Sequence, residues 1–239
     1  MRKITIVLFA LLLYGNLSGQ VWLELGGKAG FGLTGFFNDN LVNDAQHNFE
    51  LNTAFSYGGV LGLNFGENHG LNLEALSITN QQNFEFLESG DQTRIGVEWK
   101  AIDVFLMYRF YSEGGAFFEL GPKYTSVRSA EQSEGMRRFR VDDLYETEYF
   151  SAAAGFGGFL AGSEVFTVKL NLRFEYALQD FVSQQGVDEG YPAYYTSFDA
   201  YAESRPFRAS LGIEINFGLG GIAQSACGRR RFILGTAYQ

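Results

Sequence analysis

The sequence predicts an all-β fold: an eight-stranded antiparallel up-and-down transmembrane β-barrel. Three features predict it, namely long segments that alternate apolar and polar residues, connections of two lengths, and an excess of aromatic residues and glycine. Aromatic residues make up 16% of the 239 residues, and the chain contains 30 Gly but only 3 Pro. This composition suits long strands joined by tight turns, with aromatic side chains at two membrane interfaces.

The clearest alternating segment is Phe166–Asp180, with the sequence FTVKLNLRFEYALQD. Every second residue up to Leu178 is apolar or aromatic, and the residues between them include Lys169, Arg173 and Glu175. Strands of a soluble β-sandwich are usually about five or six residues long. In a membrane barrel the apolar face meets lipid and the polar face meets the lumen. The length of this segment therefore favours the barrel.

The first residues of the chain form a separate unit. Arg2 and Lys3 precede the apolar run ITIVLFALLLY, and the small residues of NLSGQ follow it. This pattern predicts a secretory signal peptide over residues 1–19, which is too short to be a spanning helix. The chain has one cysteine, Cys227, so an internal disulfide cannot form. Its 18 basic residues against 27 acidic ones argue against nucleic-acid binding, which needs a basic surface.

Eight strands are expected in the barrel domain, residues 20–218, and residues 219–239 are expected to form a flexible periplasmic tail. The predicted strands cover residues 21–33, 55–65, 71–79, 94–111, 116–127, 149–161, 166–180 and 207–217. The connections between them are long and short in turn, and one of the expected loops surrounds FLESGDQ, residues 86–92. This alternation is typical of a barrel with short periplasmic turns and long extracellular loops.

Three local features of the strands are also predicted. Apolar residues up to Trp99 and from Ile102 onward have opposite parity, so one extra residue near Lys100 and Ala101 predicts a β-bulge there. Pro122 removes a ladder hydrogen bond, which predicts a local irregularity.

The third local feature is the pairing of the last two strands. We expect Lys169 to lie opposite Glu214 and Glu175 opposite Arg208, because opposite charges favour this register. A shift of about two residues is the variation that barrel stagger allows.

Charged residues on the polar faces of the strands predict a filled lumen. Eight strands leave an interior only wide enough for side chains, and buried charges must be paired. The sequence therefore favours a plug of ion pairs, with an ion path as the alternative. The expected network consists of Glu24, Lys28, Glu74, Arg109, Glu119, Lys123, Lys169, Arg173, Glu175, Arg208 and Glu214, and Glu98, Lys100 and Asp103 are also expected to point inward.

Three segments carry a resemblance to a known family: FELGPKY at residues 118–124, LRFEYALQDF at 172–181 and RASLGIEINF at 208–217. The chain resembles the small outer-membrane β-barrel proteins of Bacteroidetes that are often called PorT-like, over about residues 20–218. The resemblance implies an eight-stranded meander in the outer membrane of a Gram-negative cell. It also implies, as an alternative function, an accessory role in protein secretion or envelope assembly.

Catalysis is not predicted. The two histidines, His47 and His69, fall in a long loop and in a short turn, so they cannot share a site. Asp44 precedes His47 by three residues, and we expect this pair to be solvated. No His or Cys pair has metal-ligand spacing, so neither a metal nor another cofactor is expected. A lipid-modifying barrel enzyme is the weaker alternative.

The long loops offer candidates for recognition. Arginine and aromatic residues together are typical of recognition surfaces. The candidates are Arg137, Arg138, Arg140, Tyr191, Tyr194, Tyr195, Phe198 and Tyr201. The same residues could instead pack together and stiffen the loops. The prediction is a non-enzymatic protein with a structural or surface-interaction role, whose partners are outer-membrane lipid and a protein bound through the loops or the tail.

Overall fold

The computed structural model describes residues 21–66, 68–88, 91–163, 166–192, 198 and 200–221. The expected signal peptide and most of the expected tail lie outside these residues, as do Tyr194 and Tyr195. The last strand continues to Gly221, so the first three residues of the expected tail belong to the barrel.

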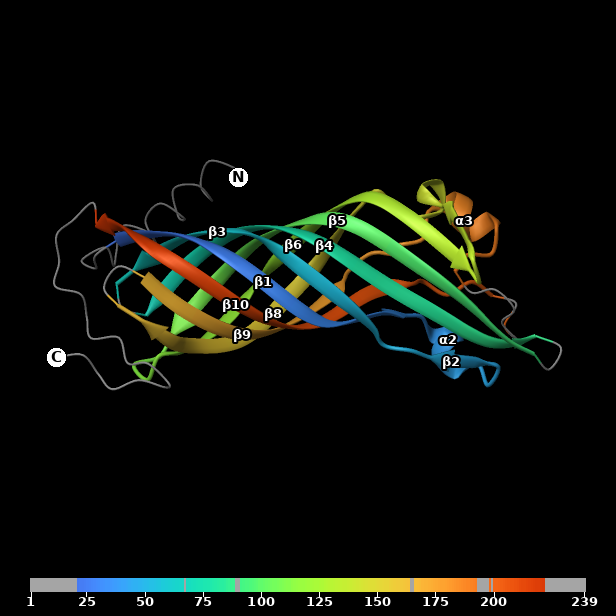
Figure 1. The fold of residues 1–239 in the computed structure, drawn as a ribbon, viewed down its shortest axis with the longest axis horizontal. Helices are drawn as coiled ribbons and strands as arrows, with labels where there is room; N and C mark the ends of the chain where they lie inside the picture. Colours follow the sequence, from blue (N-terminus) through green and yellow to red (C-terminus); the bar gives the residue numbers. More distant parts are fainter. Residues whose placement is uncertain are drawn as a thin grey trace, which may run out of the picture.

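Eight long strands form a closed antiparallel ring (Figure 1). They are β1 (Val21–Phe37), β3 (Asn52–Phe65), β4 (His69–Glu88), β5 (Asp91–Tyr111), β6 (Ala116–Glu134), β8 (Glu148–Gly162), β9 (Phe166–Ala177) and β10 (Arg205–Gly221). Each pairs with the next, and β10 closes the ring against β1. The predicted eight-stranded barrel is confirmed.

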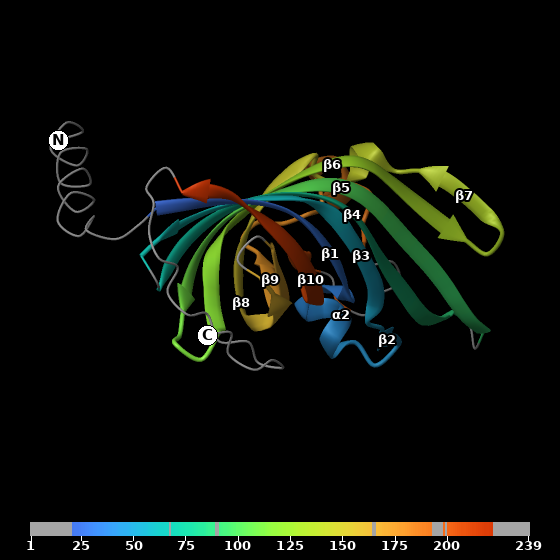
Figure 2. The same cartoon turned by 60° about the vertical axis from the view of Figure 1, so that its left-hand side comes forward.

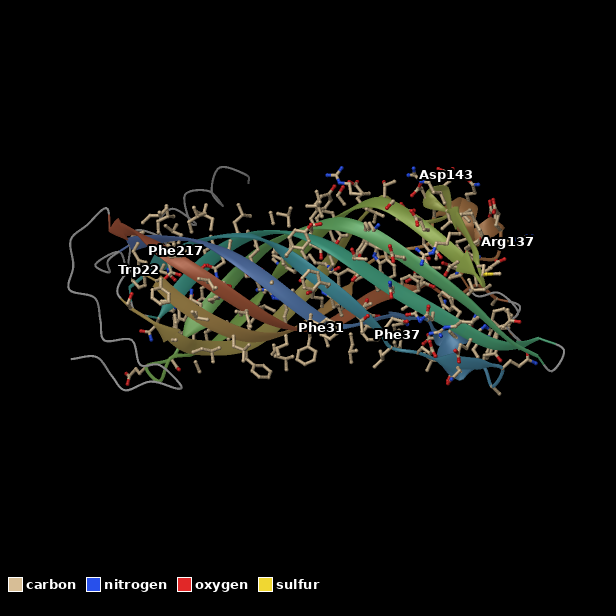
Figure 3. The ribbon with its side chains drawn as sticks, in the orientation of Figure 1. Trp22, Phe31, Phe37, Arg137, Asp143 and Phe217 are labelled. Atoms are coloured by element: carbon tan, nitrogen blue, oxygen red, sulfur yellow. The ribbon has the colours of Figure 1, made fainter. Side chains whose placement is uncertain are left out.

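Small elements gather at one end of the ring, which we call the long-loop end. They are α2 (Asp39–Asn43), β2 (His47–Phe49), β7 (Arg137–Arg140), the 3-10 helix η1 (Asp142–Leu144) and α3 (Gln184–Asp188). The opposite end carries the connections from β3 to β4, β5 to β6 and β8 to β9, and we call it the short-turn end. In Figure 3, Trp22 and Phe217 lie at the short-turn end, whereas Arg137 and Asp143 lie at the long-loop end.

No helix among the described residues is long and apolar enough to cross a membrane.

Every long strand except β9 is longer than predicted. The segment 86–92, expected to be a loop, is largely strand, because β4 runs to Glu88 and β5 starts at Asp91. β6 likewise continues to Glu134 and pairs there with β7. Figure 2 shows β4, β5, β6 and β7 reaching beyond the other strands at the long-loop end. We call this part of the sheet the extension.

The strands alternate between inward and outward side chains, as the sequence predicts. On β5 the outward residues from Ile102 to Phe110 are apolar and 36–47% exposed. This length is close to the roughly 9–11 residues with which a tilted strand crosses a bilayer. Beyond Ile102 the outward residues of the same strand are polar, beginning with Lys100. The apolar band therefore ends between these two residues.

The predicted register of the last two strands is confirmed. Lys169 pairs with Glu214 and Glu175 pairs with Arg208 along β9 and β10. The expected irregularity at Pro122 is also present, because the pairs between β5 and β6 stop at Lys123 and resume at Leu120. The pairing of Pro122 with β8 is uninterrupted.

The predicted bulge is present at Lys100 and Ala101, but its extra residue lies on the partner strand β6 and not on β5. The ladder between β5 and β6 shifts there, and the extra residue is Arg128. β5 keeps one alternation, and its pairing with β4 is continuous. Glu98 and Lys100 consequently lie on the outward face, contrary to the expectation that they point inward. The change in apolar parity has another cause, because Trp99 faces inward and belongs to an interior core.

Candidate functional sites in the lumen and at the long-loop end

The interior is built in layers, and inward side chains of β5 pass through each of them. From the short-turn end they are Tyr111, Arg109, Phe105 and Asp103, and Trp99 lies nearest the long-loop end. All five side chains are no more than 5% exposed. Charged and apolar layers therefore alternate along one strand.

A first group of charges, the lower charge cluster, fills the ring near the short-turn end. It combines four cations and four carboxylates and connects six of the eight long strands. Its members are Lys28, Arg109, Lys169, Arg173, Glu24, Glu74, Glu119 and Glu214.

Two arginines at the centre of the lower charge cluster each bridge several carboxylates. Arg173 lies 2.7 Å from Glu74 through Nη1 and 2.7 Å from Glu119 through Nη2. Arg109 lies 2.8 Å from Glu119 through Nε and 2.6 Å from Glu214 through Nη2. Arginine suits this role because its planar group presents five donors in a fixed geometry.

Lysines complete the lower charge cluster on its β1 side. Lys169 Nζ lies 2.7 Å from Glu24 Oε2, and Lys28 Nζ lies 3.1 Å from Glu74 Oε2. Glycines of the neighbouring strands leave room for the charged side chains of this cluster. A Cβ atom at Gly155 of β8, for example, would lie 3.1 Å from Glu119 Oε1 and 2.6 Å from a backbone oxygen.

A second group, the upper charge cluster, lies closer to the long-loop end. Lys123 Nζ is 2.9 Å from Glu175 and 3.4 Å from Asp103, and Arg208 Nη2 is 2.6 Å from Glu175. Thr125 donates a hydrogen bond of 2.7 Å to Asp103. This cluster also holds equal numbers of cations and carboxylates.

The structure brings together all eleven residues of the expected network. Each is at most 7% exposed, and each has an ion-pair partner within the two clusters. Asp103, which was also expected to point inward, joins them. Glu98 and Lys100 do not, because they face outward.

Apolar and aromatic side chains separate and close the charged layers. Leu76, Phe105, Met107 and Ala153 lie between the two clusters, and Tyr111, Phe117 and Phe159 pack at the short-turn end. The Arg173 guanidinium lies 4.7 Å from the centre of the Phe105 ring, and that of Arg109 lies 4.8 Å from Phe117. Such contacts favour cations that are removed from water.

An aromatic plug that sequence reasoning missed fills the long-loop end. The Phe181 ring packs 5.2 Å from Trp99, 5.5 Å from Phe36 and 4.9 Å from Tyr145, measured between ring centres. Phe181 follows β9, whereas Tyr145 follows η1, so the plug joins two loops to the ring. The signal that could have revealed it is the inward parity of Trp99.

The interior leaves little free volume where the upper charge cluster meets the aromatic plug. A pocket beside Trp99, Lys123 and Glu175 has a volume of about 10 Å³. A single water molecule needs roughly 10–15 Å³ by a comparable measure. The side chains therefore fill the lumen almost completely at this level.

The two histidines lie at opposite ends of the barrel. His47 Nδ1 is 3.3 Å from Asp44 Oδ2, and both side chains are at most 4% exposed, so the expected solvated pair is in fact buried. Its ring lies 5.6 Å from that of Phe86. His69 at the short-turn end lies 2.6 Å from the Tyr108 hydroxyl. Within the described ranges, no group of three His, Cys, Asp or Glu side chains could hold a metal ion.

Some of the loop recognition candidates are exposed in the structure, and one of them is buried. Arg137, Arg138 and Arg140 are exposed on β7, and Phe198 is 44% exposed. Tyr191 instead lies in the aromatic plug and is 8% exposed, so its expected place on a recognition surface is wrong.

Tyr201 has a mixed environment. The residue is 41% exposed, and its hydroxyl donates a hydrogen bond of 2.5 Å to Asp180. Partial burial and this bond raise the pKa of the Tyr201 hydroxyl, so the hydroxyl stays protonated as a donor.

The closed eight-stranded ring and its apolar outer band define a β-barrel, and a family model identifies the family. Residues 20–183 match the family model described as outer membrane protein beta-barrel domain, which covers more than half of the chain. The chain belongs to this family of outer-membrane barrels. Its location is therefore the outer membrane.

Solved structures give three similar proteins. OprG from Pseudomonas aeruginosa is 10% identical, with 84% of this chain and 96% of OprG covered and a TM-score of 0.47. Neisserial surface protein A is 11% identical, with 82% and 97% covered and a TM-score of 0.43. The attachment invasion locus protein Ail of Yersinia pestis is 13% identical, with 81% and 98% covered and a TM-score of 0.36. No curated protein matches the chain.

Proposed function

We propose that this protein is a non-enzymatic barrel whose lumen admits no solute and whose long-loop end acts at the cell surface. One observation carries the proposal: paired charges and aromatic side chains occupy the ring from Tyr111 to the aromatic plug. Opening a path would separate ion pairs inside a low-dielectric interior, and breaking one buried pair costs roughly 3–5 kcal/mol.

Conductance in a planar lipid bilayer tests the closed lumen. We expect the purified protein to insert without producing a steady current, while a diffusion porin under the same conditions conducts. A double variant, Trp99→Ala with Phe181→Ala, removes two rings of the aromatic plug and should still be closed by the charge clusters. A steady current through the unaltered protein would contradict the proposal.

The surface role rests on the exposed side chains of the loops. Three arginines of β7 and Phe198 face solvent beyond the apolar band, while the band itself contacts outer-membrane lipid. Residues 1–19 act in this proposal as the export signal. We further propose that the protein belongs to the Bacteroidetes PorT-like group. For this group the alternative function is an accessory role in secretion or envelope assembly.

Photo-crosslinking in living cells separates a surface partner from a periplasmic one. A photoreactive residue replaces Met136, which is fully exposed beside β7, or Glu113, which is exposed in the turn between β5 and β6. We expect protein adducts at position 136 and none at position 113. Adducts at position 113 alone would favour the accessory role and overturn the surface role.

The buried Asp44–His47 pair is the observation that favours a second candidate, a lipid-modifying enzyme. We propose that the pair instead fixes the loop between β1 and β3, since Asp44 also accepts a hydrogen bond of 3.0 Å from the backbone of Gln46. Envelope lipids of a deletion strain should match those of the same strain carrying the gene or its His47→Ala variant. A lipid change restored only by the unaltered gene would indicate an enzyme.

A further inference from the structure

The outward face of the extension begins with two cations at the edge of the apolar band. Ile102 and Val104 are the last apolar outward residues of β5, and Lys100 follows with a side chain 56% exposed. Arg128 is the extra residue at the register shift opposite Lys100 and Ala101, and it is also exposed. Both cations therefore lie where hydrocarbon gives way to polar headgroups.

The surroundings leave these cations available to an anion. Lys100 has one carboxylate neighbour, Glu98, at 3.5 Å. Arg128 forms no ion pair with any residue in the part of the chain that the structure describes. Arg128 is therefore a guanidinium without a carboxylate partner among the described residues, and such a group is the complement of a phosphate.

A polar groove lies directly above the cations on the same face. Its volume is about 180 Å³, and Asn83, Gly96, Ser133 and Arg138 form a row across β4, β5, β6 and β7 at its centre. Gly96 keeps the groove open, because a Cβ atom there would lie 2.7 Å from Ser133 Oγ and 2.9 Å from Asn83 Oδ1. The groove is smaller than the roughly 300–1,000 Å³ of sites for drug-sized ligands.

The distance between the two cations and the groove indicates the class of ligand. Gly96 is four residues beyond Lys100 on β5, which corresponds to about 13 Å along a strand. A phospholipid whose phosphate contacts the cations would not extend a headgroup that far. The sugar head of a glycolipid is long enough to reach the groove. The amides, hydroxyls and carboxylates that line the groove are groups that hydrogen-bond sugar hydroxyls.

We propose that Lys100, Arg128 and the Gly96 groove form a binding site for a phosphorylated glycolipid of the outer leaflet. The acyl chains lie against the apolar band, the phosphate contacts the two cations, and a sugar of the head occupies the groove. The groove shares Arg138 with the loop recognition candidates, whereas Lys100 and Arg128 do not belong to them.

Native mass spectrometry of the detergent-solubilised protein tests the site. The probes are rough-type lipopolysaccharide, the same glycolipid after removal of its phosphates, and phosphatidylglycerol. We expect the unaltered protein to retain the phosphorylated glycolipid about tenfold more tightly than either other probe, since one charge-assisted contact is worth roughly this factor.

Two variants locate the binding. Lys100→Ser with Arg128→Ser should lose about tenfold or more in affinity for the phosphorylated glycolipid, and Gly96→Val should remove the preference for this glycolipid over phosphatidylglycerol. The matched control is Arg137→Ser with Arg205→Ser, which removes one exposed arginine and one whose side chain is 36% exposed, and it should bind normally. Equal loss in the control pair, or equal binding of the dephosphorylated probe, would overturn the proposal. Normal binding by Gly96→Val would reduce the site to a phosphate contact and overturn the glycolipid assignment.

Discussion

The lower charge cluster and the aromatic plug fill two levels of the same ring with opposite chemistry. The lower charge cluster lies within the apolar band, where the outward side chains, such as Leu106 and Phe110, face lipid. The aromatic plug lies beyond Ile102, where the outward residues, such as Lys100, are polar. Within the apolar band the outward residues are apolar and the inward ones include the lower charge cluster, whereas beyond the band the outward residues are polar and the inward ones form the aromatic plug. The reason is that the medium outside the barrel changes from hydrocarbon to water.

This difference between the two levels explains the change in parity of apolar residues along β5. Trp99 packs inward in the aromatic plug, while Ile102 packs outward against lipid, and the backbone alternates without interruption between them. Each level thus satisfies the rule that apolar groups avoid water. A single strand can follow both the membrane pattern and the soluble pattern if its environment changes along its length.

The two levels also differ in what they connect. The lower charge cluster joins strands to one another through ion pairs of defined geometry, so it stabilises the ring itself. The aromatic plug joins the loops after η1 and β9 to the ring through Tyr145 and Phe181. Damage to the two levels should therefore have different consequences.

Arg109→Leu should produce the largest loss of stability. Arg109 contacts Glu74, Glu119 and Glu214 with no exposure to solvent, so the substitution leaves buried carboxylates with fewer cations. We expect the free energy of unfolding to fall by about 3–5 kcal/mol. Urea unfolding in lipid vesicles measures it, with Arg94→Leu as the exposed control. Equal effects of the two variants would show that the charge cluster adds no stability to the ring.

Phe181→Ala should have a smaller and more local effect. Removing a buried phenylalanine costs roughly 3–5 kcal/mol where the whole protein depends on it. Here the loss should fall mainly on the loop after β9, because Phe181 connects that loop to the ring. Hydrogen exchange of the segment from Ser183 to Tyr191 should accelerate while the ring strands stay protected.

The matched control for this experiment is Phe174→Ala on β9, which removes a phenylalanine that faces lipid and is 50% exposed. It should leave the exchange of the loop unchanged. Acceleration throughout the ring in Phe181→Ala would mean that the aromatic plug and the strands unfold together.

The register of the ring could be predicted because local rules decide it. Alternation assigns a face to each residue, and opposite charges then align Lys169 with Glu214 and Glu175 with Arg208. The same alternation placed the eleven network residues in the lumen. These predictions need only the period of a strand and the sign of each charge.

The wrong predictions concern residues outside the apolar band, where the alternation of a membrane-spanning strand no longer assigns polar residues to the lumen. Glu98 and Lys100 were expected to point inward because polar residues do so within the apolar band, yet both lie beyond it. Tyr191 was expected on a surface, but the aromatic plug collects residues from loops that are distant in sequence. Neither the level at which the band ends nor such loop packing follows from local alternation.

Arg140→Ala should have the smallest effect and shows how strongly burial matters to an ion pair. Arg140 Nη2 lies 2.6 Å from Asp142 Oδ2, as close as Arg109 lies to Glu214, but the Arg140 side chain is 69% exposed. Water and salt screen such a pair, which typically contributes about 0.2–1 kcal/mol. In urea unfolding, the small destabilisation should disappear as salt rises to about 1 M, where the screening length is about 3 Å. The larger loss in Arg109→Leu should persist at the same salt, because the lumen excludes the ions. If salt removed both effects, the charge clusters would have to be open to solvent, and the contrast between a dry lumen and a wet loop surface would fail.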